Sequence, residues 1–179
     1  MMKRKPAVKV AEYGCMLALA MIISYIEVIL PVSLGIPGAK LGLANFIVVL
    51  CLYGYGKTAA AVINISRVIL CGLLFGSLYS MQYALAGAFF SLIVMILCSK
   101  IKVFGMVGVS ILGGVAHNLA QLIVATFISQ APVILFYVPF LVVIGGITGC
   151  ANGILANIIY KRVPIFANVK EEKRNAEKE

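Results

Sequence analysis

PGAKLGLANF, residues 37–46, lies between two long apolar runs and contains a lysine, Lys40, where a simple membrane anchor has no charge. Pro37 and Gly38 disfavour helix, so the residues up to Lys40 are expected to lead from one apolar helix into the next. The flanking runs indicate the fold class, because long apolar runs are typical of membrane-spanning helices. Lys40 has three interpretations: a marker of topology, half of a structural ion pair, or a contact for a bound molecule.

The composition of the chain also favours a membrane protein. Of its 179 residues, 63% are hydrophobic and 12% are charged, whereas soluble globular domains average roughly 45–50% and 25%. Such a chain has too little polar surface for water, while helices in lipid need none in their middle. We therefore expect one all-α integral membrane domain.

Basic residues give the chain a net charge of +9, but their positions argue against a nucleic-acid partner. They lie in short connections and at the two chain ends, with no basic helical face and no interleaved aromatic residues. Membrane topology and anionic lipid explain this distribution better, so the lipid bilayer is the expected partner.

Six apolar segments are expected to cross the bilayer, and the first is too long for a signal peptide. With a cytoplasmic N-terminus, all of the 15 basic residues except Lys40 and Arg67 fall on the cytoplasmic side, as the positive-inside rule requires. This predicts a multi-pass protein of the cell membrane with both ends inside, a membrane domain over 1–163 and a charged cytoplasmic tail over 164–179. The six expected spans are 10–30, 41–55, 58–75, 78–98, 103–129 and 133–160.

Arg67 falls near the middle of the third expected span. An arginine at the bilayer centre costs about 2.5–3.5 kcal/mol on insertion scales and is tolerated mainly when it faces the bundle interior with a partner. Glu27 is the candidate charge partner, for Arg67 or for Lys40, and Asn64 is a candidate neutral neighbour one turn before Arg67. Structural pairing and a functional role both remain open for these charges.

A polar cluster, GGVAHNLAQ, occupies residues 113–121 of the fifth expected span. On a helix, Gly113, His117 and Gln121 recur every four residues on one stripe, with Asn118 beside it. The glycine leaves room for a neighbour, and the polar side chains offer hydrogen-bond donors and acceptors. The cluster indicates either a ligand-binding face or polar contacts that hold helices together.

Several kinds of chemistry are missing from the sequence. The chain has no aspartate, and its glutamates are Glu12, Glu27 and those of the tail. It therefore has no aspartate-rich magnesium site and no P-loop ATPase motif. Its five cysteines lie in apolar runs without metal-ligand spacing. We expect neither catalysis by this chain alone nor a metal or other cofactor.

Two segments together resemble a known family: PGAKLGLANFIVVLCLYGYGKTAAAVINISRVILCGLLFGS (37–77) and GGVAHNLAQLIVA (113–125). They are similar to the Gx transporter family, also catalogued as heptaprenyl diphosphate synthase component I. More distantly, the chain resembles the substrate-binding S components of energy-coupling factor (ECF) vitamin transporters. The second resemblance implies a six-helix protein that binds a small molecule near the outer face, while a coupling subunit and ATPases drive uptake.

The resemblance to S components also implies roles for individual residues. Lys40 and Asn45 would lie at the edge of the substrate pocket, which would be lined by His117, Asn118 and Gln121. On the first helix, small residues would pack against the transmembrane coupling subunit, and these are Gly14 and Ala18.

The ligand is expected to carry an anionic group. Lys40, Arg67 and His117 would make the outer half of the protein positive against Glu27 alone, so Arg67 joins the candidate ligand-binding residues. The synthase name implies an alternative, a membrane subunit that accompanies a separate catalytic subunit, because prenyl synthases use the aspartate-rich motifs that this chain lacks.

Overall fold

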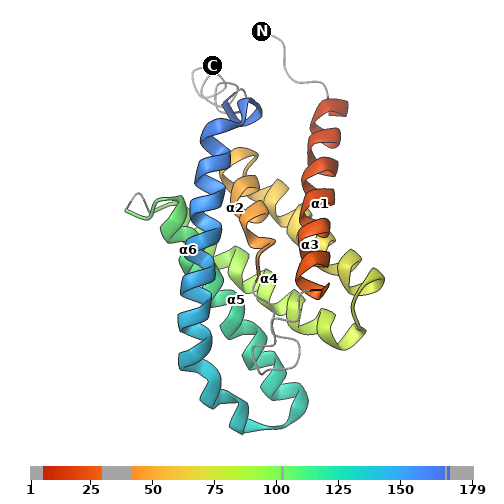
Figure 1. Cartoon of the computed structure of the whole chain (residues 1–179), viewed down its shortest axis with the longest axis vertical. Coiled ribbons are helices and arrows are strands. Elements are labelled where there is room, and N and C mark those ends of the chain that lie inside the picture. Colours follow the sequence, from red (N-terminus) through yellow and green to blue (C-terminus); the bar gives the residue numbers. More distant parts are fainter. Residues whose placement is uncertain (1–5, 30–41, 102, 168, 170–179) are drawn as a thin grey trace.

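The computed structural model describes residues 6–29, 42–101, 103–167 and 169. Successive helices reverse direction, so that α1 begins and α6 ends at the same end of the molecule (Figure 1). The predicted all-α class is confirmed for these ranges. Their regular elements are α1 (Pro6–Ile29), α2 (Asn45–Gly54), α3 (Lys57–Leu74), α4 (Leu78–Ser99), α5 (Met106–Ser129), a 3₁₀ helix η1 (Pro132–Tyr137), and α6 (Val138–Arg162).

The described ranges contain five helical segments that are long and apolar enough to cross a membrane: α1, α3, α4, α5, and η1 with α6. Four of the expected spans correspond to single helices with ends shifted by a few residues, and the sixth is divided where η1 passes into α6. A multi-pass membrane protein follows from these lengths. The side of the membrane that each end faces stays a prediction.

The expected second span, 41–55, is shorter than predicted. Helix α2 has only 10 residues, so it covers about 15 Å, roughly half of a hydrocarbon core of about 30 Å. The cause is Gly42, whose φ of +71° is incompatible with a right-handed helix. Its carbonyl instead accepts a 3.0 Å hydrogen bond from the Asn45 N–H in a turn. Lys40 lies outside the described residues.

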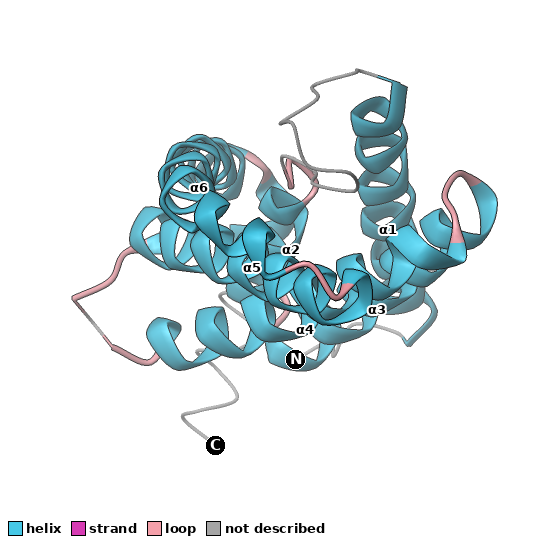
Figure 2. Ribbon diagram, turned by 90° about the horizontal axis from the view of Figure 1, so that it is seen from below, coloured by secondary structure: helices cyan, strands magenta, loops and turns pink. Residues whose placement is uncertain are grey.

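Helix α2 nevertheless occupies the centre of the bundle. Every residue from Asn45 to Leu52 is buried, and the helix packs against α1, α3, α5 and α6. Figure 2 shows it between α6 and α1, with α1 at the edge beside α3. Apolar residues around the whole circumference are typical of such a central helix.

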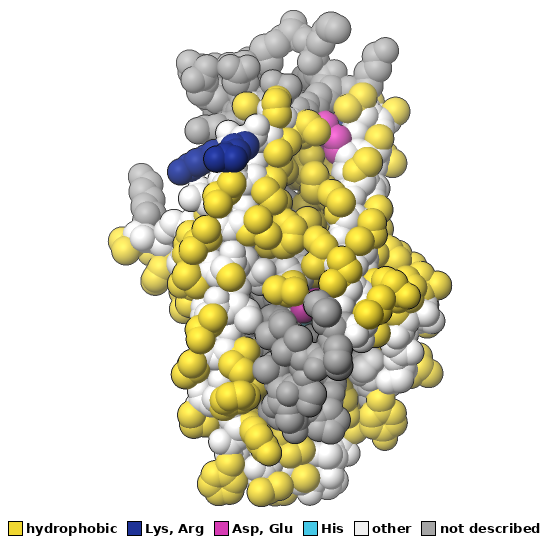
Figure 3. Space-filling view, viewed as in Figure 1, with side chains coloured by type: hydrophobic (Ala, Val, Ile, Leu, Met, Phe, Trp, Pro, Cys, Tyr) yellow, Lys and Arg dark blue, Asp and Glu magenta, His cyan; other side chains and the backbone are white. Residues whose placement is uncertain are grey.

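Apolar side chains cover the exterior of the longer helices. In α1 only Ala20 and Ser24 are buried, and apolar side chains dominate the face shown in Figure 3. Basic side chains on that face gather near one end, and Lys161 and Arg162 form the last turn of α6. Such an exterior is suited to lipid, because exposing this much apolar surface to water is unfavourable.

Helices α5 and α6 approach each other closely through glycines. Gly145, Gly149 and Gly153 recur every four residues along α6 and lie on one stripe. A Cβ at Gly149 would lie 2.7 Å from the carbonyl oxygen of Ser110, and one at Gly153 would lie 2.7 Å from the Cα of Val107. Small residues at such contacts let two backbones pack tightly where no hydrophobic effect drives association.

The packed part of the chain extends beyond the expected domain boundary at 163. Phe166 is 1% exposed, and its ring covers Gly54, where a Cβ would lie 2.6 Å from it. Its ring centroid is 5.7 Å from that of Tyr55 and 5.5 Å from that of Tyr160. These contacts attach the segment after α6 to the end of α2.

We expect the Gly149→Ala substitution to destabilise the protein, because the added methyl group meets a backbone oxygen of α5 that cannot rotate away. Overpacking of this kind costs about 1–3 kcal/mol. The control is Gly146→Ala, where nothing lies within 4 Å of the added atom. Thermal unfolding in detergent should show a lower midpoint for Gly149→Ala alone, and equal midpoints would contradict the close α5–α6 contact.

Candidate functional site

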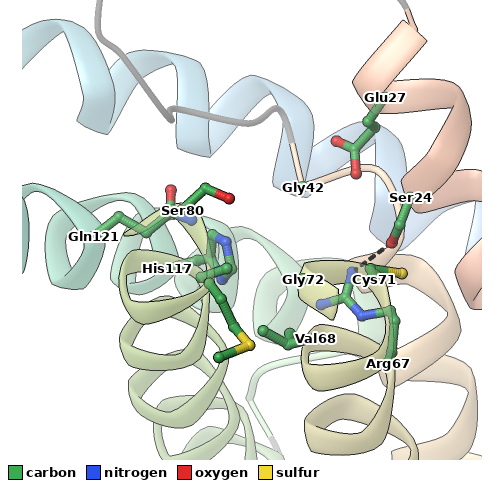
Figure 4. A pocket seen from close by; sticks show the side chains of 12 residues that line it. Ser24, Glu27, Gly42, Arg67, Val68, Cys71, Gly72, Ser80, His117 and Gln121 are labelled. Atoms are coloured by element: carbon green, nitrogen blue, oxygen red, sulfur yellow. Dashed lines mark hydrogen bonds between the residues drawn. The ribbon is translucent and has the colours of Figure 1, made fainter. Parts of the chain in front are cut away.

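A cavity lined by both polar and apolar side chains opens between α1, α3, α4 and α5, beside the turn that precedes α2 (Figure 4). The centre of a water-sized sphere can occupy about 30 Å³ of it, and about 460 Å³ of empty space lies between the lining atoms once the open mouth is included. This space accommodates a few waters or one small polar group. The lining residues are Ser24, Glu27, Gly42, Arg67, Val68, Cys71, Gly72, Ser80, Met81, Ala84, His117 and Gln121.

Arg67 of α3 is 5% exposed and is held by neutral partners. Its Nη1 donates to Ser24 Oγ of α1 at 3.3 Å, and its Nη2 donates to Asn64 Oδ1 at 3.0 Å. Asn64 is oriented in turn, because its Nδ2 donates to the Ala88 carbonyl of α4 at 3.0 Å. The predicted contact with Asn64 is confirmed. The Nε of Arg67 is buried and has no hydrogen-bond partner within the described residues.

Glu27 lines the same cavity but is not the direct partner of Arg67. Its Oε1 accepts a 2.8 Å hydrogen bond from the Leu43 N–H, in the turn before α2. The direct Glu27–Arg67 pair considered from the sequence is therefore absent from the described structure. Ser24, one turn before Glu27 on α1, accepts the hydrogen bond from Arg67 Nη1 instead.

The opposite wall of the cavity comes from α4 and α5. His117 and Gln121 are 4% and 7% exposed, and both line the cavity. A Cβ at Gly87 of α4 would lie 2.8 Å from Gln121 Cγ and 2.9 Å from His117 Cε1. Glycine at position 87 thus leaves the space that these two side chains occupy. Gln121 Nε2 is buried without a hydrogen-bond partner within the described residues.

Two expected pocket residues lie elsewhere. Asn118 is buried between α5 and α6, and its Nδ2 donates to the Leu141 carbonyl at 3.1 Å. Its side chain therefore makes one of the polar contacts that hold helices together. Asn45 begins α2 and is buried, but it is not part of the cavity lining. On α1, Gly14 and Ala18 are both exposed, away from the cavity.

Asn152 and Ser24 were not recognised in the sequence. Asn152 of α6 is 4% exposed, and its Nδ2 donates to the Gly42 carbonyl at 2.9 Å, which holds the turn beside the cavity. A signal was available, because an amide in an apolar span needs a partner. Little in the sequence singled out Ser24, since a serine in a helix can donate its hydroxyl to a backbone carbonyl of the same helix and needs no partner elsewhere.

No metal centre is visible among the described side chains, since no three His, Cys, Asp or Glu residues lie together in a way that could hold an ion. The cavity is instead suited to hydrogen bonding with an organic molecule. It offers a guanidinium, a carboxylate, an imidazole and an amide within one polar space.

Comparison with known proteins gives one match. The sequence profile of a family described as heptaprenyl diphosphate synthase component I matches residues 16–159. This range contains every residue that lines the cavity. No curated protein and no solved structure matches the chain.

We expect the Asn152→Ala substitution to destabilise the turn before α2, because the buried Gly42 carbonyl would lose its side-chain donor. The Gly42 carbonyl would keep its 3.0 Å bond from the Asn45 N–H, so the expected cost is that of one lost hydrogen bond, about 0.5–1.5 kcal/mol. Asn157→Ala is the matched control, since Asn157 lies on the same helix, is only half-buried and makes no side-chain hydrogen bond in the described structure. A thermal midpoint that falls as far for Asn157→Ala as for Asn152→Ala would contradict the anchoring role.

Proposed function

The chain belongs to the heptaprenyl diphosphate synthase component I family, and we propose that it acts as the substrate-binding (S) component of an energy-coupling factor type transporter. In this role it captures a small organic molecule with an anionic group at the outer face of the cell membrane. A transmembrane coupling subunit and ATPases then drive uptake.

The observation that carries this proposal is a partly open cavity, lined in part by charged and polar side chains, inside a bundle with an apolar exterior. Two buried donors in its lining, Arg67 Nε and Gln121 Nε2, lack acceptors within the described residues. Buried polar groups are normally satisfied, so these atoms favour a ligand that brings acceptor oxygens. A carboxylate or phosphate would gain most, because hydrogen bonds between a guanidinium and an anion are strong.

The exterior of α1 supports docking of a coupling subunit. Gly14 and Ala18 are exposed, and no described atom lies within 4 Å of a Cβ placed at Gly14. Small residues allow another transmembrane helix to approach closely. Lys40 remains in the proposal as a contact at the outer mouth, on the basis of the sequence alone.

A second function is favoured by the family description. It is that of a non-catalytic membrane subunit associated with heptaprenyl diphosphate synthase. The chain contains no aspartate, so magnesium-dependent condensation of diphosphates would have to come from another subunit. The polar cavity is not needed for simple anchoring, which is why we place this function second.

We expect the full chain, purified in detergent, to release a small anionic organic molecule when heated, detected by mass spectrometry. The Gln121→Leu substitution should weaken retention by roughly two- to tenfold, since a hydrogen bond contributes about 0.5–1.5 kcal/mol. The control is Gln82→Leu, at an exposed position on α4. Equal retention by the two variants would rule out this cavity as the binding site.

The two functions predict different protein partners. Purification of the tagged full chain from its native membrane under mild conditions should recover an ATPase and a second membrane protein if it is an S component. Substituting Gly14 and Ala18 with leucine should reduce that recovery, because bulk would keep a partner helix away. Recovery of a soluble aspartate-rich synthase, unaffected by these substitutions, would support the second function instead.

A further inference from the structure

The two charged residues in the described lining of the cavity, Glu27 and Arg67, lie on the same wall, with Ser24 beside them (Figure 4). Arg67 Nη1 donates to Ser24 Oγ at 3.3 Å, while Glu27 accepts from the Leu43 N–H at 2.8 Å. The cation and the anion therefore face one cavity without a direct bond to each other. Such a geometry leaves both charges available to a third group.

Each of these charges has unused hydrogen-bonding capacity. Arg67 Nε is buried, and no acceptor for it lies among the residues that the structure describes. Glu27 accepts only the bond from Leu43 among the described residues, although a carboxylate has about four lone-pair sites. An ionised group taken out of water needs such partners, because uncompensated burial is costly. One ligand that supplies both an acceptor and a donor would satisfy the two residues together.

The opposite wall contributes no Asp, Glu, Lys or Arg among its described residues. It presents the Gln121 amide, the His117 imidazole, Ser80 and the Met81 thioether. The charged groups of a ligand would therefore be directed to the α1–α3 wall. Its remaining part would contact the α4–α5 wall with polar or apolar uncharged groups.

We propose that the ligand of this cavity is a zwitterion, with an anionic group at Arg67 and a protonated amine at Glu27. Because both residues lie on one wall beside Ser24, the two ligand charges are close together, as in an amino acid. A purely anionic ligand would bring its charge next to Glu27, where like charges repel. This inference rests on the proposed function and narrows its class of substrate.

A specificity reversal tests the inference. Purified full-length protein in detergent is incubated with amino acids, with carboxylates that lack the amino group and with amines that lack the carboxylate, in series of matched chain length. Retained compounds are measured by mass spectrometry. The wild type should retain at least one amino acid about tenfold better than its matched carboxylate and matched amine.

The Glu27→Gln substitution should remove the preference for the amino acid over its matched carboxylate, while the carboxylate is retained at least as well as before. Glutamine keeps an oxygen for the Leu43 N–H, so the turn before α2 should stay in place. The control, Glu12→Gln, removes the same charge from the same helix outside the cavity lining. It should leave the wild-type preference unchanged.

The outcomes separate this inference from the function on which it rests. If the wild type retains carboxylates better than amino acids, or if Glu27→Gln keeps the amino-acid preference, the zwitterion inference is wrong while a binding function stands. If the wild type retains nothing above empty detergent micelles, both the binding function and the inference fail. A preference that disappears equally in Glu12→Gln would also overturn the assignment to Glu27.

Discussion

A guanidinium inside an apolar bundle needs hydrogen-bond acceptors, and in the described structure Nη1 and Nη2 of Arg67 each have one. Its partners are Ser24 of α1 and Asn64 of its own helix, and Asn64 also donates to the Ala88 carbonyl of α4. Ser24 is one of only two buried residues in α1. The interaction that makes Arg67 tolerable in the bundle therefore also attaches the outermost helix to it.

The short helix α2 follows from a second constraint of the same kind. Non-helical backbone at membrane depth is tolerated only where protein or a cavity surrounds it, because lipid cannot accept its hydrogen bonds. In the turn before α2, the Leu43 N–H is satisfied by Glu27 and the Gly42 carbonyl by Asn152. These two side chains come from α1 and α6, on either side of α2. They hold the turn in position, and Gly42 forms part of the cavity lining as a result.

Close packing and open space have complementary origins in this bundle. On α6, glycines remove side chains where α5 must approach, and the two backbones come into contact. On α4, Gly87 removes a side chain at a place where His117 and Gln121 of α5 can enter. The same residue type thus gives a tight helix contact in one case and room for polar side chains in the other. Which of the two results depends on whether the neighbouring helix brings backbone or side chains to the glycine.

The sequence by itself determined the membrane class, most helix positions, the need of Arg67 for partners, and the shared stripe of His117 and Gln121. These properties depend on apolar content, helix period and the cost of burying charge, all of which act locally. Tertiary structure decided that Arg67 bonds to Ser24 and not to Glu27, that Asn118 faces α6, and that Gly42 stops α2 short. Contacts between helices depend on their relative rotation and depth, which are set by packing across the whole bundle and which no local pattern encodes.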